Sequence, residues 1–190
     1  MKRDPVTRIY QLRVALRHTK PEIWRRVLVA GQTNLNTLHY IMQTAMGWEN
    51  MHLHLFRVGD VEYSDPDMKV ARAKDEFSAK LFRIAPKKGG AFTYEYDFGD
   101  SWNHAIKVEA VSEGDDRYPG HPVCIGGARA CPPEDCGGVP GYEYLLKAIR
   151  DPKHPDHQYK VGRFGGRIDP EAFDVDSVSR GLTQAVTQAR

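Results

Sequence analysis

Apolar and polar residues alternate with a period of two along several stretches of the chain, a pattern typical of half-buried strands. The stretches are 9–16, 23–29, 51–58, 61–63, 81–84, 91–96 and 102–111. Pro21 lies between the first two, where it suits a connection because proline cannot donate to a strand ladder. Short turns between neighbouring stretches favour antiparallel pairing, so the pattern predicts a mostly antiparallel sheet of about six strands.

Apolar residues recur at helical spacing in about three other regions. These regions are 35–46, 140–150 and a last one that opens at 169–171 and runs to about 186. Thr33 or Asn34 can cap the first helix, and Gly47 can end it in a left-handed conformation. Residues 64–77 are expected to form a connection or a short irregular helix, and 154–166 a loop. Together these elements predict an α+β fold in a single domain over 1–190.

The composition narrows the classes of partner and location. Hydrophobic residues make up 41% and charged residues 27% of the 190 residues, and the net charge is +2. So small a charge does not indicate a polyanion partner, and direct nucleic-acid binding is not expected. No stretch reaches the roughly 20 apolar residues of a membrane span. The charged residues 1–5 have no apolar segment behind them, so we expect no secretory signal and a cytoplasmic location.

All three cysteines lie within 112–141, a region rich in proline and glycine that lacks periodicity. The odd count argues against a secreted disulfide framework and for reduced thiols or a metal site. Cys124, Cys131 and Cys136 could bind zinc, with His104 or His121 as the fourth ligand. No CxxC pair is present, however, and cysteines packed as small hydrophobes without a metal fit the sequence equally well. The rigid prolines of this long Cys/Pro/Gly loop also suit a partner-binding surface.

The densest cluster of aromatic and acidic side chains lies at 94–104, around a turn at Gly99. Aspartate side chains accept bonds from backbone N–H groups in turns, so Asp97 and Asp100 could stabilise the turn. Trp102 could in the same way be a core residue. Alternatively, these residues converge with the acidic part of the cysteine loop and bind a cation or polarise a water molecule, with Trp102 as a lid on the ligand. The predicted ligand-binding residues are Asp97, Asp100, Trp102, His104, Glu134 and Asp135. We expect the cysteine loop to fold across this turn.

Three further histidines lie on predicted elements. His52 and His54 project from one face of the expected strand 51–58 and could chelate a metal, although polar positions on any half-exposed strand look the same. His39 lies on or beside the apolar stripe of the first helix, which indicates a core or boundary histidine rather than a ligand.

The order of these segments resembles one family, the plasmid pRiA4b ORF-3-like family, also called the passenger TnpR family of an insertion element. The matching segments are 10–14, 21–26, 38–48, 52–56, YDFGDSW at 96–102 and ACPPEDCGG at 130–138. The resemblance covers roughly 7–180 and implies an α+β fold on a mostly antiparallel sheet. It implies little about activity beyond an association with mobile elements. A serine recombinase is not indicated, because no serine precedes Ser64.

The sequence names no reaction, and enzymatic activity is not the first expectation. It favours a cytoplasmic binding or accessory module, associated with mobile DNA, that recognises an unidentified protein or small ligand at the YDFGDSW turn and the cysteine loop. The rival class is a small metal-dependent hydrolase or nuclease-like enzyme that uses Asp97, Asp100, His104 and the cysteine loop.

Overall fold

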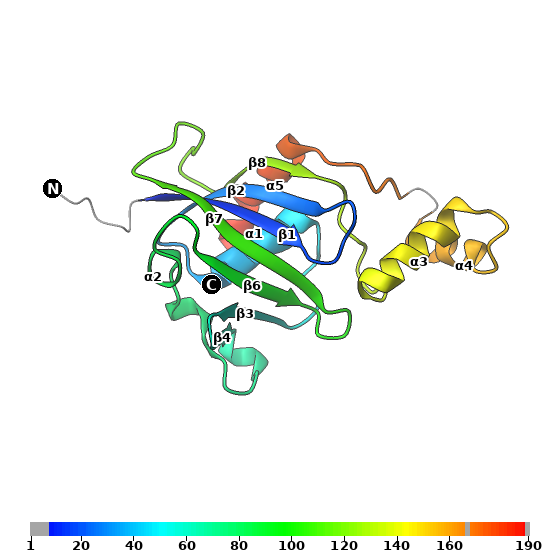
Figure 1. The fold of residues 1–190 in the computed structure, drawn as a ribbon, viewed down its shortest axis with the longest axis horizontal. Coiled ribbons are helices and arrows are strands. Elements are labelled where there is room, and N and C mark those ends of the chain that lie inside the picture. Colours follow the sequence, from blue (N-terminus) through cyan, green and yellow to red (C-terminus); the bar gives the residue numbers. More distant parts are fainter. Residues whose placement is uncertain (1–7, 166–167, 189–190) are drawn as a thin grey trace.

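The computed structural model describes residues 8–165 and 168–188, and its centre is one eight-stranded sheet (Figure 1). The strand order is β5-β4-β3-β6-β7-β1-β2-β8, and neighbouring strands are antiparallel except β4 and β5. The strands are β1 Ile9–Leu16, β2 Ile23–Ala30, β3 His54–Val58, β4 Val61–Ser64, β5 Lys74–Asp75, β6 Ala91–Tyr96, β7 Trp102–Ser112 and β8 Val123–Ala128. The predicted α+β fold on a mostly antiparallel sheet is confirmed.

The middle of the sheet follows the period-two pattern closely. β1 and β2 form the predicted antiparallel hairpin, with Ile9 opposite Ala30 and Leu16 opposite Ile23. β7 runs along the other side of β1, and its buried residues alternate at 102, 104, 106 and 108. Because alternate residues of a strand share a face, this face of β7 belongs to the core.

Helices α1 (Leu35–Met46) and α5 (Val175–Gln188) both lie behind β1, β2 and β7 in Figure 1. The side chain of Asn34 caps α1 by accepting a bond from the Thr37 N–H, and Gly47 ends it with a φ of 86°, as the sequence predicts. The buried stripe of α1 includes Leu38 and Ile41, both fully buried. No helix of the described chain is long and apolar enough to cross a bilayer.

A separate pair of helices, α3 (Gly138–Arg150) and α4 (His157–Phe164), projects from one end of the sheet (Figure 1). The beginning of α3 lies beside the turn that joins β6 to β7. α4 occupies part of the predicted loop 154–166, so that expectation is wrong. α4 has no buried residue and no side-chain cap. Its sequence therefore shows neither a capping residue at its start nor a stripe of core residues, the two features that mark a helix.

Three other expectations for local structure are wrong. Residues 81–84 form a short helix, α2 (Leu81–Ile84), because their N–H groups bond to the segment before α1 and to Lys80 rather than to a strand. β3 begins at His54 rather than at 51. β8 lies within the predicted cysteine loop, which shortens that loop. Gly127 of β8 marks close packing and not a turn, since a Cβ there would lie 2.5 Å from the Phe173 ring.

The described residues thus contain five helices and eight strands, against about three and about six expected. The additional elements are short. Besides these elements, two single 3₁₀ turns, η2 (Pro66–Met68) and η3 (Glu76–Ser78), lie in and at the end of the connection predicted to be irregular. Each is capped by an aspartate that precedes it.

Candidate functional site

The turn between β6 and β7 is built on the side chain of Asp97. This residue has a left-handed φ of 56°, and its Oδ1 accepts bonds from the Gly99 N–H at 2.9 Å and the Asp100 N–H at 3.3 Å. The turn role that the sequence left open for Asp97 is therefore present. Its other oxygen, Oδ2, lies 3.8 Å from Nε2 of His52. One half of the carboxylate holds the turn, and the other half faces the histidine.

The cysteine-loop segment 132–137 lies across this turn. The Gly137 N–H donates to Oδ2 of Asp100 at 3.0 Å, and the Trp48 indole N–H donates to the Pro132 carbonyl at 2.9 Å. Gly138 has a φ of 67°, and a Cβ on it would lie 2.5 Å from the Asp100 carbonyl oxygen. The structure therefore brings the two predicted pieces together, with Asp100 as the residue on which the segment docks.

Glu134 is held in this segment by two donors on a single oxygen. Its Oε1 accepts a bond from the Tyr96 hydroxyl at 3.0 Å and another from the Glu49 N–H at 3.0 Å. Burial, together with the Glu134 carboxylate, raises the pKa of Tyr96, so this hydroxyl keeps its proton. The second oxygen of Glu134, Oε2, is buried without a hydrogen-bond partner and lies 3.8 Å from Nε2 of His52.

His52 is the point on which these carboxylates converge. Its Nε2 lies 3.1 Å from Oδ1 of Asp135, in addition to the two contacts at 3.8 Å. One ligand atom from each of His52, Asp97 and Asp135 lies within 4.8 Å of the others. An open pocket of about 760 Å³ borders this group, lined by Gly47, Glu49, Met51, His52, Pro133, Glu134, Asp135, Arg163 and Phe164.

Two predicted site residues lie elsewhere. Trp102 and His104 are fully buried in the core side of β7, so Trp102 is a core residue rather than a lid. His104 packs edge-on against Trp48, and burial lowers its pKa to about 4. Conversely, sequence reasoning missed Arg163 and Phe164 of α4, because the residues around them have no clear periodicity.

The predicted zinc ligands are not gathered into one group. Cys124 belongs to β8, where its backbone N–H bonds to Ser179, whereas the sulfur of Cys131 contacts that of Met46 at 3.3 Å. Burial raises the pKa of Cys131 to about 11 and that of Cys136 to about 12, which favours neutral thiols. The only group in the described chain that satisfies metal-ligand spacing is His52, Asp97 and Asp135. Zinc on the cysteines stays a prediction.

His121, the alternative fourth ligand, lies near the surface beside Pro122 and Thr183. His121 therefore lies beside helix α5 and not beside the turn that holds Asp97. His52 and His54 also have separate partners: His54 is buried and contacts Glu76, while His52 faces the pocket. Their chelation of one metal ion, which the sequence left open, is not supported by this arrangement.

A buried polar network supports the segment that carries His52. His39 contacts the Tyr94 hydroxyl through Nδ1 at 2.8 Å and Oδ1 of Asn50 through Nε2 at 2.7 Å, and it stacks on His54 at 3.6 Å. His54 in turn contacts the fully buried Glu76 at 2.8 Å. His39 is thus the core histidine that the sequence indicates. Asn50 lies two residues before His52, so the network fixes this segment from within.

The buried histidines predict a pH dependence of stability. The pKa of His104 falls from 6.5 to about 4 in the folded state, so below pH 6.5 the unfolded chain takes up a proton that the folded chain does not. The free energy of unfolding should therefore decrease from about pH 6.5 to about pH 4, by up to about 1.4 kcal/mol per pH unit for this histidine. Burial lowers the pKa of His39 as well, which acts in the same direction. Urea unfolding at several pH values measures this slope.

A matched variant separates His104 from the other titrating groups. In His104→Gln the decrease between pH 6.5 and 4 should be smaller than in the wild type, whatever the variant's stability at neutral pH. Equal slopes for the two proteins would show that His104 does not contribute.

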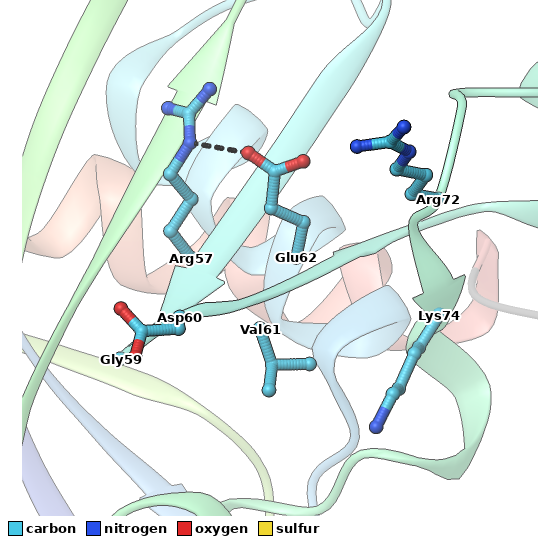
Figure 2. A pocket seen from close by; sticks show the side chains of 7 residues that line it. All are labelled: Arg57, Gly59, Asp60, Val61, Glu62, Arg72 and Lys74. Carbon is cyan, nitrogen blue, oxygen red and sulfur yellow. Dashed lines mark hydrogen bonds and ion pairs between the residues drawn. The ribbon is translucent and has the colours of Figure 1, made fainter.

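A second pocket, of about 330 Å³, lies at the other end of β3 (Figure 2). There the guanidinium of Arg57 bonds to Glu62 at 2.8 Å and also to Glu95 at 2.8 Å. Figure 2 shows Arg72 on the far side of Glu62 and the Lys74 side chain directed away from both. The central carboxylate of this pocket, Glu62, is already paired with Arg57. It is therefore less available to bind a ligand than the carboxylates beside His52.

Comparisons with known proteins agree with this fold. A family model described as plasmid pRiA4b ORF-3-like protein matches residues 8–177. The chain belongs to this family. The resemblance carried by the YDFGDSW and ACPPEDCGG motifs is thereby confirmed.

Two relatives of this pRiA4b ORF-3-like protein match nearly the whole chain. The uncharacterized protein y4hQ of Sinorhizobium fredii (strain NBRC 101917 / NGR234) is 37% identical over 186 residues, which cover 94% of this chain and 89% of the relative. The crystal structure of MM3350 from Methanosarcina mazei Go1, a protein of unknown function, matches with a TM-score of 0.80 and 32% identity. That match covers 90% of this chain and 98% of the other. These relatives establish fold and family and assign no activity.

Proposed function

We propose that this pRiA4b ORF-3-like protein is a binding module that recognises a partner polypeptide at the pocket beside His52. The observation that carries the proposal is the position of the exposed apolar side chains. In the described chain the large hydrophobic residues that are exposed are Met51, Leu53, Phe98, Tyr144 and Tyr159. Met51 lines this pocket, and Leu53 and Phe98 directly follow His52 and Asp97 beside it. Tyr159 belongs to α4, whose Arg163 and Phe164 also line the pocket, and Tyr144 belongs to the adjoining helix α3.

Three of these residues lie on the sheet side of the pocket. Met51, which is 72% exposed and lines the pocket, and Leu53 flank His52 directly. Phe98 follows Asp97, whose N–H bonds to the Leu53 carbonyl at 2.9 Å. An apolar edge of this kind, next to polar groups, is typical of an interaction surface and uncommon on a surface without a partner.

The opposite side is formed by Arg163 and Phe164 of α4, and α3 packs beside α4. The Nζ of Lys160 lies 5.6 Å from the ring centroid of Tyr144 and 5.7 Å from those of Tyr159 and Phe164. Arg163, whose guanidinium lies over Phe164 at 5.2 Å, lines the pocket together with that ring. Tyrosine, phenylalanine, methionine and arginine are the residue types enriched at the centres of protein interfaces.

The charge of the pocket indicates which group of the partner enters it. Glu49, Glu134 and Asp135 line it against the single cation of Arg163, so the lining is acidic. A lysine or arginine side chain, flanked in its own chain by apolar residues, complements this arrangement. The partner class is therefore a polypeptide that presents a cationic side chain between apolar ones.

Two further parts of the proposal concern the setting. The family description refers to a plasmid, which supports an accessory role associated with mobile DNA. The net charge of +2 supports a protein partner over the nucleic acid itself. A cytoplasmic location follows from the expectation that the cysteines are reduced.

Selection of short phage-displayed peptides against the immobilised protein tests this function. We expect the enriched peptides to carry lysine or arginine between apolar residues. The double variant Met51→Ala, Phe98→Ala should bind the same peptides at least about tenfold more weakly, since it removes the apolar edge without changing the charge. Arg72→Ala, which truncates a side chain at the pocket of Figure 2, is the matched control and should bind as the wild type does.

Failure to enrich any peptide, or equal binding by the wild type and the double variant, would contradict the proposed function. A fluorescent single-stranded oligonucleotide supplies a further arm. Binding of that probe, with an affinity that falls steeply with salt, would replace the polypeptide partner by a nucleic acid. We expect no such binding.

A further inference from the structure

We infer that His52, Asp97 and Asp135 form a binding site for a divalent transition-metal ion at the edge of the same pocket, which His52 and Asp135 line. This inference does not depend on the proposed partner, and the ion and the partner's cationic side chain would compete for Asp135. Its first basis is spacing: one nitrogen and two carboxylate oxygens lie within 4.8 Å of one another. Imidazole together with carboxylate is a donor set that suits Zn²⁺ and Mn²⁺.

The second basis is a carboxylate oxygen without a partner. Oε2 of Glu134 is buried, has no hydrogen-bond partner and lies 3.8 Å from Nε2 of His52, while Oε1 is held by Tyr96 and Glu49. Buried polar atoms in folded proteins almost always have a partner, and an ion is one of the explanations for an exception. A cation bound to His52 would lie next to this oxygen.

The third basis is the way Asp97 is held. It is 7% exposed, and its Oδ1 accepts the N–H groups of Gly99 and Asp100, so its orientation is fixed. Its Oδ2 has only the distant contact to His52 at 3.8 Å. Metal-binding carboxylates are commonly held in this manner, with one oxygen bonded to the protein and the other directed at the ion.

The three groups can close onto an ion with small movements. Metal–ligand bonds of about 2.0–2.2 Å place neighbouring ligand atoms about 3–3.5 Å apart. The side chains of His52 and Asp135 are 30% and 57% exposed, so they have room to move toward the fixed Asp97. His52 and Asp135 line the pocket, so a ligand in the pocket could reach an ion bound there. Such an ion is also the first requirement of the metal-dependent hydrolase that the sequence leaves as a rival class.

Metal binding is tested on the full chain without an affinity tag, after treatment with a chelator. Mn²⁺ is titrated by the loss of its free electron paramagnetic resonance signal, and Zn²⁺ by competition with a chromophoric chelator. We expect one ion per chain and a rise in melting temperature with the metal. His52→Gln and Asp97→Asn should each weaken Mn²⁺ binding at least about tenfold. Asparagine keeps an acceptor oxygen and tolerates a left-handed φ, so the turn is preserved.

Two control variants make the assignment specific. Glu49→Gln removes a pocket carboxylate outside the group and should leave the affinity for Mn²⁺ within about twofold of the wild type, because only the backbone N–H of Glu49 holds Glu134. Cys131→Ser should likewise bind Mn²⁺ normally. Absence of Mn²⁺ and Zn²⁺ binding, or binding that Asp97→Asn leaves intact, would overturn the inference. Zn²⁺ binding lost only in Cys131→Ser would also overturn it and assign the metal to the cysteines. Since the ion is titrated alone, the result is independent of the peptide selection.

Discussion

Replacing Glu76 by alanine is expected to lower the free energy of unfolding by about 3–5 kcal/mol, among the largest losses for a single substitution in this protein. Glu76 is fully buried, and its carboxylate bonds to the side-chain amide of Asn36 at 2.9 Å and contacts His54 at 2.8 Å. Removal leaves both polar partners buried and unpaired, which costs more than the lost bonds alone. At about 2–4 °C per kcal/mol, the melting temperature should fall by roughly 6–20 °C.

The partly exposed Glu62 supplies the matched control. It also pairs with a cation, Arg57, at 2.8 Å, but the two side chains are 37% and 42% exposed, respectively. Glu62→Ala should therefore cost no more than about 1 kcal/mol. Chemical denaturation of both variants measures the difference. Equal small losses would mean that the contacts between Glu76, Asn36 and His54 do not stabilise the fold.

Gly138→Ala is expected to detach the 132–137 segment from the β6–β7 turn and to destabilise the protein by about 2–4 kcal/mol. Gly138 has a φ of 67°, which alanine adopts only with strain, and its Cβ would lie 2.5 Å from the Asp100 carbonyl oxygen. The backbone can relieve this contact only by moving away from the turn. Since Pro132 accepts the Trp48 indole N–H, tryptophan fluorescence should change together with the stability.

Gly162→Ala is the same substitution in the neighbouring helix α4. A Cβ there meets nothing within 4 Å, and its φ lies outside the left-handed region. This variant should be stabilised by about 0.4–1 kcal/mol, because alanine restricts the unfolded chain. If Gly138→Ala were as stable as the wild type, with unchanged fluorescence, the segment would not be held against the turn as the structure shows it.

The fold could be predicted where side-chain periodicity and burial agree. β6 and the first part of β7 alternate cleanly because one face of each lies on the core. β1 and β2 alternate over part of their length, and α1 has a regular apolar stripe with both ends marked. β8 could not be predicted in this way. Its Gly127 is required by the nearby Phe173 ring, and close packing of this type has no local signature. α2 adopts a helix through contacts with the segment before α1, which are equally non-local.

The sequence predicted which chain segments meet at the candidate site, but it did not predict which histidine lies among the carboxylates. The acidic turn and the acidic part of the cysteine loop do meet, through Asp97, Glu134 and Asp135. The sequence favoured His104 for this group, because it lies close to the turn along the chain. In the structure His104 alternates into the core, and His52, which lies two residues before β3, takes the position between the carboxylates. Tertiary placement of this kind does not follow from spacing along the chain.

The proposed function requires that the protein binds its partner at the pocket between 47–52, the 132–137 segment and α4. Amide chemical-shift mapping during titration with the most enriched peptide tests this claim most directly. We predict that the largest shifts fall on 49–53, 97–100, 133–135 and 159–164, and that they disappear in the Met51→Ala, Phe98→Ala variant. Shifts gathered instead around 57–62 and 72–74, at the pocket of Figure 2, would contradict the claim.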